Sequence, residues 1–203
     1  MPRMLDLFAG RLGWTKAFLA RGWTVIAVDL VIPELTPHGV TFIQDDVRNW
    51  NADMVRSYGI DFGCASSPCE QFSVFGMAMF HPDPEYPFEG IELFNHTRAL
   101  FERAKIPYVM ENVRPAWRFV GQEANRCGPF SLWGNAVPPI LPQGITKGFG
   151  KWDRDYILTT GSSKSKKRME MKAKWAEIPP ELANCVADYA GRLLEQKCQT
   201  IGT

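Results

Sequence analysis

The sequence predicts an α/β fold with a mostly parallel sheet flanked by helices. Apolar strand-like runs alternate with helical patterns through the first two thirds of the chain, which is typical of parallel strands joined by crossover helices. The 203 residues are enough for one domain with a full core and at most a small appendage. We therefore expect a single domain that spans residues 1–203.

Strands and helices can be assigned along most of the chain from their apolar periodicity. A polar, proline-rich loop is expected between Pro68 and Pro87, and little regular structure from Gln143 to Lys174. The expected strands are residues 4–9, 24–30, 40–43, 62–66, 108–110 and 130–133, and the expected helices are 14–21, 91–103 and one that begins near 179.

Composition excludes several classes of protein. The net charge is +1, so binding to a polyanion must come from a local patch. No apolar run approaches the roughly 18 residues of a membrane span and no signal peptide precedes the first strand, so we expect a soluble, cytoplasmic protein. The five cysteines lack the paired spacings of a zinc site, so no metal is expected and free thiols are favoured.

A glycine-rich turn follows the first strand, in the segment Leu5–Gly13. Such a turn lets a ligand approach backbone amides, although alone it is equally compatible with a structural turn. Asp29 ends the second strand roughly twenty residues later, where a carboxylate can accept both hydroxyls of a ribose. Asp46 follows the third strand and could accept an adenine amino group or cap a turn. Together these residues predict an adenosine-containing cofactor, and the incomplete dinucleotide fingerprint favours S-adenosylmethionine over NAD.

A thiol and a carboxylate complete the set of reactive groups. Cys69 follows Pro68 in a tight loop after a strand, and Glu111 comes at the end of the next strand. A thiolate can add to C6 of a cytosine while a carboxylate holds N3. The structural alternatives are a buried core thiol for Cys69 and a partner of a backbone amide for Glu111.

Three motifs occur in one order at the ends of predicted strands: Asp6-Leu7-Phe8-Ala9-Gly10, Pro68-Cys69 with Phe72-Ser73, and Glu111-Asn112-Val113. In this arrangement the chain resembles the C5-cytosine DNA methyltransferases over roughly residues 4 to 113. The resemblance implies a Rossmann-like, S-adenosylmethionine-dependent methyltransferase fold. It also implies methyl transfer to C5 of cytosine in DNA through a covalent Cys69–C6 adduct, after the base has left the stack.

The same resemblance implies a role for each residue. Cys69 is the expected nucleophile, and Glu111 is expected to hold N3 and the exocyclic amine. Arg126 is the candidate, by position, for the arginine that grips the target base and its phosphate, with an ordinary surface arginine as the alternative. The expected cofactor-binding residues are Asp6, Phe8, Ala9, Gly10, Gly13, Asp29, Asp46 and Pro68.

Two features of the C-terminal half and three departures also bear on the resemblance. Residues 133–139 and 178–183 both resemble the family's last motif, and the second is preferred because a helical pattern follows it. Leu12 stands where the family usually has glycine, Ser66-Ser67 replace a glycine-rich lead-in, and Glu70 replaces a glutamine. A carboxylate at Glu70 disfavours a neighbouring thiolate unless it faces a cation.

Residues 138–174 are all that is available for target recognition. Within this segment the expected nucleic-acid-binding residues are Lys164, Lys166, Lys167 and Arg168, with a solvated loop as the alternative. The expected partner is double-stranded DNA, read with a short or relaxed target sequence or with help from a specificity partner. So compact an enzyme suggests a monomer that protects the DNA of a bacterial virus from restriction.

Other functions stay open at this point. The same chemistry could act on RNA, single-stranded DNA or a free cytosine nucleotide, or could transfer a modified one-carbon group. From a different class, the chain could be a catalytically idle nucleic-acid-binding module, although such a module needs neither Cys69 nor Glu111. An NAD-dependent oxidoreductase is a more remote alternative.

Overall fold

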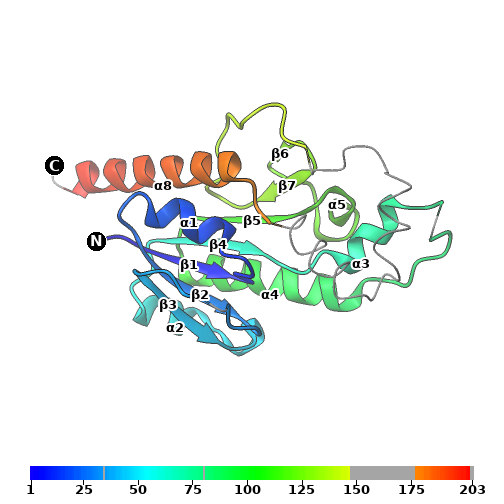
Figure 1. Ribbon diagram of the computed structural model, residues 1–203, viewed down its shortest axis with the longest axis horizontal. Helices are drawn as coiled ribbons and strands as arrows, with labels where there is room; N and C mark the ends of the chain where they lie inside the picture. The colour runs from blue at the N-terminus through cyan, green and yellow to red at the C-terminus, as the bar shows by residue number, and fades with distance from the viewer. Residues whose placement is uncertain (34, 80, 147–176, 202–203) are drawn as a thin grey trace.

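The computed structural model describes residues 1–33, 35–79, 81–146 and 177–201 (Figure 1). Within these residues seven strands form one sheet in the order β3-β2-β1-β4-β5-β7-β6. The strands are β1 (Arg3–Leu7), β2 (Thr24–Asp29), β3 (Val40–Gln44), β4 (Phe62–Ser66), β5 (Tyr108–Val113), β6 (Asn125–Cys127) and β7 (Phe130–Trp133).

The sheet is mostly parallel, as the sequence predicts. Strands β3, β2, β1, β4 and β5 pair in parallel. β7 pairs antiparallel with β5, and β6 pairs antiparallel with β7, so β6 runs in the same direction as the first five strands. The chain adds β2 and β3 on one side of β1 and then returns to add β4 and β5 on the other. This change of direction creates a switch point between β1 and β4, and open α/β sheets bind ligands at the carboxyl ends of such strands.

Helices cover both faces of the sheet (Figure 1). Helices α1 (Gly13–Leu19) and α8 (Pro180–Ile201) contact each other on one face, and α2 (Ala52–Ser57) and α4 (Phe88–Ala104) contact each other on the other. Each face has its own apolar core. Phe18 and Leu182 join the core under α1 and α8, while Phe94 and Phe101 join the core under α4.

Local sequence explains the central strands. β2 reads Thr-Val-Ile-Ala-Val-Asp, and its four apolar residues are buried alternately in the two cores, as expected of a parallel strand covered on both faces. Gly63 in β4 allows α4 to approach, because a Cβ at this position would lie 2.5 Å from the ring of Phe101. The absence of a side chain at Gly63 therefore lets β4 pack closely against α4.

The expected strands and helices are confirmed, with differences at their ends and in one loop. The strand expected to stop before Glu111 continues to Val113, because β7 extends its ladder of hydrogen bonds. The loop expected to be irregular after Cys69 begins with two short helices, α3 (Glu70–Ser73) and the 3-10 helix η2 (Val74–Gly76). Five further short elements were not predicted: η1 (Val47–Asn49), α2, η3 (Arg114–Ala116), α5 (Trp117–Val120) and β6. In the part of the chain that is described, no helix is long and apolar enough to cross a membrane.

Candidate active site

The switch point brings the three sequence motifs to one edge of the sheet. The glycine turn follows β1, the Pro68-Cys69 loop follows the adjacent strand β4, and Glu111 lies in β5, the next strand along. Ser66, the last residue of β4, is the register partner of Glu111. Neighbouring strands lie about 4.8 Å apart, and Cys69 is three residues beyond Ser66, a span of about 10 Å at most. The predicted nucleophile and carboxylate therefore belong to one small region.

Cys69 lies at the bend where the chain leaves β4. Its backbone (φ −104, ψ −2) occupies the sparsely populated bridge region in which many active-site residues are found. The carbonyl of Cys69 accepts hydrogen bonds from the amides of Phe72 and Ser73 and from the Ser73 hydroxyl. Helix α3 therefore begins at this residue, and the buried Phe72 anchors the helix to the core under α4. These hydrogen bonds thus fix the bend on the side that leads into α3.

The remaining cysteines differ from Cys69 in their surroundings. Cys64, Cys127, Cys185 and Cys198 are free thiols, as the sequence predicts. Burial raises the pKa of the Cys64 thiol, and the neighbouring Asp6 carboxylate raises it further. Burial also raises the pKa values of Cys127 and Cys185. These three side chains are expected to remain protonated thiols, and none of them follows a strand at the switch point.

Asn112 ties the cysteine loop to β5. Its side-chain amide donates hydrogen bonds to the carbonyl oxygen of Ser67 at 3.0 Å and to the Ser67 hydroxyl at 3.1 Å, and both partners are buried. The Asn112 carbonyl oxygen accepts from the amide of Val113. Sequence reasoning included Asn112 in a motif without giving it a role. The pair fixes the residue two positions before Cys69 to the strand that carries Glu111.

Glu111 is a buried acidic residue, with 6% of its surface exposed. Its register partners are Ser66 in β4 and Leu132 in β7, and Leu132 packs in the core under α1 and α8. The Ser66 hydroxyl accepts a hydrogen bond from the indole nitrogen of Trp14 at 3.0 Å. Trp14 in α1 therefore holds the end of β4 beside Glu111, a contact that no sequence signal indicated.

The glycine turn has an unusual backbone. Phe8, Gly10 and Leu12 all have positive φ values, of 57°, 46° and 62°. For the two non-glycine residues this left-handed conformation costs roughly 1–2 kcal/mol each. Leu12 thus adopts a conformation that a glycine would favour. The Gly10 amide donates to the Asp29 carboxylate at 2.9 Å, which joins the turn to the end of β2.

Asp6 lies beneath this turn rather than in it. The side chain is only 1% exposed, and its Oδ2 accepts hydrogen bonds from the Thr15 amide at 3.2 Å and from the Thr15 hydroxyl at 2.6 Å. Its Oδ1 is buried and has no hydrogen-bond partner among the described residues. Burial raises the pKa of Asp6 to about 7, because the charged carboxylate is poorly solvated there. Asp6 is thus placed to hold the first turn of α1, and the structure gives it no exposed surface for a cofactor.

Asp29 and Asp46 end adjacent strands at the same edge. Asp29 accepts from the amides of Gly10 and Val31. Asp46 caps η1 and receives three side-chain hydrogen bonds and one backbone hydrogen bond from Arg48, which hold the pKa of its carboxyl below the usual value. The capping alternative for Asp46 is therefore confirmed, while its adenine contact stays a prediction.

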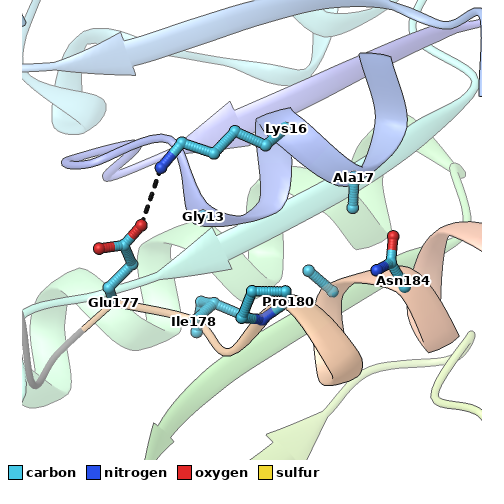
Figure 2. Close-up of a pocket in the computed structure, with 8 residues that line it drawn as sticks. Gly13, Lys16, Ala17, Glu177, Ile178, Pro180 and Asn184 are labelled. Carbon is cyan, nitrogen blue, oxygen red and sulfur yellow. Dashed lines mark hydrogen bonds and ion pairs between the residues drawn. The ribbon is translucent and has the colours of Figure 1, made fainter. Parts of the chain in front are cut away.

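Gly13, at the end of the glycine turn, contacts the segment that precedes α8. A Cβ at Gly13 would lie 3.0 Å from Ile178, so the glycine allows this close approach. A cavity of about 250 Å³ lies beside this contact, between α1 and the start of α8, and Figure 2 shows Lys16 bound to Glu177 across its rim. The preference for residues 178–183 as the last motif is supported, because α8 begins at Pro180 and this segment contacts the turn.

The remaining predicted residues have different positions. Pro68 and Glu70 are exposed beside Cys69, and no cation among the described residues forms an ion pair with Glu70. Arg126 is exposed on β6, opposite Ser131, which is itself opposite Asn112. Two strand spacings, about 10 Å, thus separate the backbone of Arg126 from that of Asn112. Lys164, Lys166, Lys167 and Arg168 lie outside the described residues.

The residues at this edge fit an adenosine ligand without phosphates. Asp29, Asp45 and Asp46 place three carboxylates at the ends of β2 and β3, where they can accept from hydroxyl and amino groups. The same charges would repel a pyrophosphate and favour a cationic ligand. No group of acidic, histidine or cysteine side chains suited to a metal ion occurs in the described part of the chain.

Comparisons with known proteins add likeness of fold only. No protein-family model matches the chain, and no curated protein matches it. Among solved structures, the Dnmt2 methyltransferase of S. pombe aligns with 59% of this chain at 15% identity and a TM-score of 0.42, over 37% of its own length. The DNMT2 of Spodoptera frugiperda, as a mutant, aligns with 56% at 17% identity and a TM-score of 0.39, over 36% of its length. A putative epimerase from Bacteroides thetaiotaomicron aligns with 54% at 14% identity, over 46% of its length, and has the same TM-score of 0.39.

The aligned part of this chain spans less than half the length of each of these structures. Because methyltransferases and an epimerase align about equally, the matches do not choose between functions. The Rossmann-like fold is nonetheless clear from the sheet itself, with its mostly parallel strands, flanking helices and switch point.

Proposed function

We propose that this chain is a methyltransferase that transfers a methyl group from S-adenosylmethionine to C5 of cytosine in DNA. The observation that carries the proposal is the link between the Cys69 loop and β5. Asn112 lies in β5 directly after Glu111, and its side chain binds Ser67, two residues before Cys69. A nucleophile and a carboxylate are thereby fixed on neighbouring strands at a ligand-binding edge.

The chemistry explains why both residues are needed. C5 of cytosine is a weak nucleophile, so the thiolate of Cys69 first forms a bond to C6, and the electrons of the C5–C6 double bond become available at C5. Glu111 holds N3 and the exocyclic amine, and a proton donated from its carboxyl group to N3 offsets the negative charge that develops on the ring as sulfur adds. S-Adenosylmethionine, when bound, supplies the electrophilic methyl group. After C5 has received it, loss of the C5 proton and departure of the Cys69 sulfur restore the ring.

The proposed cofactor site is the edge formed by the glycine turn and the ends of β2 and β3. Asp29 would accept from the ribose hydroxyls, and Asp46 from the adenine amino group, alongside the backbone of Phe8, Ala9 and Gly10. Support comes from the three carboxylates at this edge and from the hydrogen bond that joins Gly10 to Asp29. Asp6 and Gly13 would act indirectly in this proposal, because they contact Thr15 and Ile178.

Target binding is proposed on the remaining predicted residues. Arg126 would contact the base or its phosphate, and residues 138–174 would supply the reduced recognition region with its basic run, Lys164, Lys166, Lys167 and Arg168. A cytosine in a duplex must leave the stack before Cys69 can reach C6, so base flipping is part of the proposal. The proposal also includes a short target sequence or a specificity partner, a monomeric state, and a role in protecting phage DNA from restriction.

The direct test is methyl transfer with product identification. The protein would be incubated with methyl-labelled S-adenosylmethionine and, separately, duplex DNA, single-stranded DNA, RNA and cytosine nucleotides. Digestion and mass spectrometry should then give 5-methylcytosine from DNA. Label found in RNA or in a nucleotide would show that the substrate is not DNA, and a heavier product would indicate a modified one-carbon group. Binding of S-adenosylmethionine without transfer to any substrate would contradict the proposal.

A further inference from the structure

A cluster of aromatic side chains reaches the surface close to the Cys69 helix. Tyr86 and Phe88 are 56% and 74% exposed, and their rings lie 4.6 Å apart. Tyr86 meets the ring of Phe119 edge-on at 5.6 Å. We call these three residues the aromatic platform. Two adjacent, largely exposed aromatic rings are unusual on a protein surface, and they provide faces on which a planar ligand can stack.

The platform is firmly attached to the element that begins at Cys69. Phe119 contacts Phe75 at 4.7 Å and the fully buried Phe72 at 6.0 Å, measured between ring centroids. The side-chain carbonyl of Gln71 accepts a hydrogen bond from the Gly90 amide at 2.8 Å, which joins α3 to the first turn of α4. The exposed rings therefore keep a fixed position relative to the proposed nucleophile. Figure 1 shows α3, α5 and the nearby end of α4 together beyond the strand ends.

Charge is unevenly distributed around the platform. Arg114 and Arg118 are exposed on the segment from η3 to α5, which packs against α3 and η2, and Arg118 donates a hydrogen bond to the carbonyl of Phe75. Within the described residues no carboxylate lies close enough to form an ion pair with either arginine. Two acidic residues flank the platform in the sequence: Glu85 directly precedes Tyr86, and Glu89 directly follows Phe88. A polyanion would thus be directed toward the arginines and away from the acids.

We propose that the aromatic platform stacks an unpaired base next to the target cytosine, with the phosphates of the same strand on Arg114 and Arg118. The substrate class that this surface fits is single-stranded or locally unpaired DNA, because the bases of an intact duplex are stacked on one another and cannot stack on Tyr86 and Phe88. Every base has a π face, so such a contact is tolerant of sequence. The inference rests on the proposed function in taking cytosine in DNA as the target.

The test compares oligonucleotide binding with methyl transfer in matched variants. The Tyr86→Leu/Phe88→Leu double variant keeps apolar bulk but removes the π faces. Tyr189→Leu is the control, because it makes the same exchange at an aromatic residue of α8 whose ring lies beside Arg192. Binding would be measured by fluorescence anisotropy with a labelled single-stranded 12-mer that contains one cytosine. The same probe with abasic sites on both sides of the cytosine tests the stacking itself.

We expect the double variant to bind the single strand roughly 5- to 100-fold more weakly, in line with alanine substitutions at stacking sites. KM should rise with little change in kcat, and the abasic probe should bind wild type as weakly as the normal probe binds the variant. Arg118→Gln should lower the salt dependence of binding by a slope of about 0.7, the value for one phosphate of a single strand.

The outcomes separate this inference from the proposed function. If wild type methylates DNA but the double variant binds and reacts like Tyr189→Leu, the platform inference is overturned and the methyltransferase proposal stands. Equal affinity of wild type for the normal and abasic probes also overturns it. If wild type neither binds nor methylates any of the DNA substrates, both proposals fail.

Discussion

The two ends of the central strands use similar hydrogen bonds in different surroundings. At the carboxyl ends, Asn112 binds Ser67 with both partners buried, and Asp6 binds Thr15 beneath a turn with two strained residues. At the amino ends, Asn135 accepts from the amide of Tyr108, and Asp61 accepts from the amide of Arg3, where solvent has access. Among the described residues, buried polar groups are therefore concentrated at the carboxyl ends. Two of the three non-glycine residues with positive φ lie there as well, while the third, Lys105, precedes the amino end of β5.

This difference shows where the fold departs from the most stable arrangement. Left-handed residues and buried polar groups lower stability and persist where the surrounding structure holds them in place. In this chain they occur at the switch point, where we place the active site. The amino ends of the same strands provide matched positions, so each prediction below compares one residue from each end or from the same helix.

The largest effect is expected at Glu111. Glu111→Gln keeps the size of the side chain but removes the carboxyl group that is proposed to donate a proton to N3, so the rate of methyl transfer should fall by roughly 10²- to 10⁴-fold. Glu102→Gln is the control, because Glu102 accepts a hydrogen bond from the Tyr108 hydroxyl at the other end of β5. Single-turnover rates on DNA would be compared. Equal rates for the two variants would remove Glu111 from the mechanism.

Two asparagines that act at opposite ends of β5 should separate activity from stability. Asn112 lies in the strand, and Asn135 binds its first residue, Tyr108. Asn112→Ala leaves the buried Ser67 carbonyl without its donor, which costs about 1–3 kcal/mol, and it should also lower kcat because the Cys69 loop is released. Asn135→Ala removes part-buried hydrogen bonds to the Tyr108 amide and the Ile106 carbonyl, and it should lower the unfolding free energy by about 0.5–1.5 kcal/mol with kcat unchanged. Urea unfolding and kcat per folded molecule would be measured. A full kcat in Asn112→Ala would show that the link does not position Cys69.

Asp6 should make stability depend on pH. Its pKa is raised from 3.8 to about 7 in the folded protein, so the fold favours the protonated form. Its contribution to stability is complete below pH 3.8 and is lost as the pH rises through about 7. Wild type should therefore be less stable at pH 8 than at pH 5, and Asp6→Asn should remove most of this difference. Asp61→Asn, at the amino end, should retain it, and an unchanged slope in Asp6→Asn would contradict the assignment.

The smallest effect concerns the backbone of the turn. Alanine usually stabilises a protein relative to glycine, but a left-handed conformation reverses this order. Leu12→Gly should therefore be more stable than Leu12→Ala by about 1 kcal/mol, while Ala17→Gly in α1 should be less stable than wild type by a similar amount. Thermal unfolding of the variants would measure both differences. The normal order at Leu12 would mean that the turn is not strained.

Much of this arrangement could be predicted from the sequence. Apolar periodicity located the parallel strands, and strands that end in the same direction bring Cys69 and Glu111 to one edge without knowledge of side chains. Asp6 was predicted to bind a cofactor, yet it lies between Leu5 and Leu7 in a strand that is buried on both faces, so its burial could have been anticipated. The sequence predicted that Asp6 lies near the end of a strand, but it did not indicate whether the side chain faces the ligand.

Other features depend on tertiary contacts that no local pattern encodes. The bond from Asn112 to Ser67 joins residues 45 positions apart and requires the register of β4 with β5. The aromatic platform joins Tyr86 and Phe88 to Phe119 through the packing of α4 against α5, and the sequence showed only separate aromatic residues in a proline-rich region and beyond. The length of β5 was underestimated because β7, which pairs with its end, comes later in the chain.

The most direct test of the proposed mechanism is a covalent trap. DNA that contains 5-fluorocytosine would be incubated with the protein and S-adenosylmethionine and then run on a denaturing gel, because fluorine at C5 prevents the elimination that releases Cys69. We expect a protein–DNA complex from wild type and from Cys198→Ala, in which an exposed cysteine of α8 is removed, and none from Cys69→Ala. A complex that persists in Cys69→Ala, or its absence in wild type that binds both S-adenosylmethionine and DNA, would contradict the assignment of Cys69 as the nucleophile.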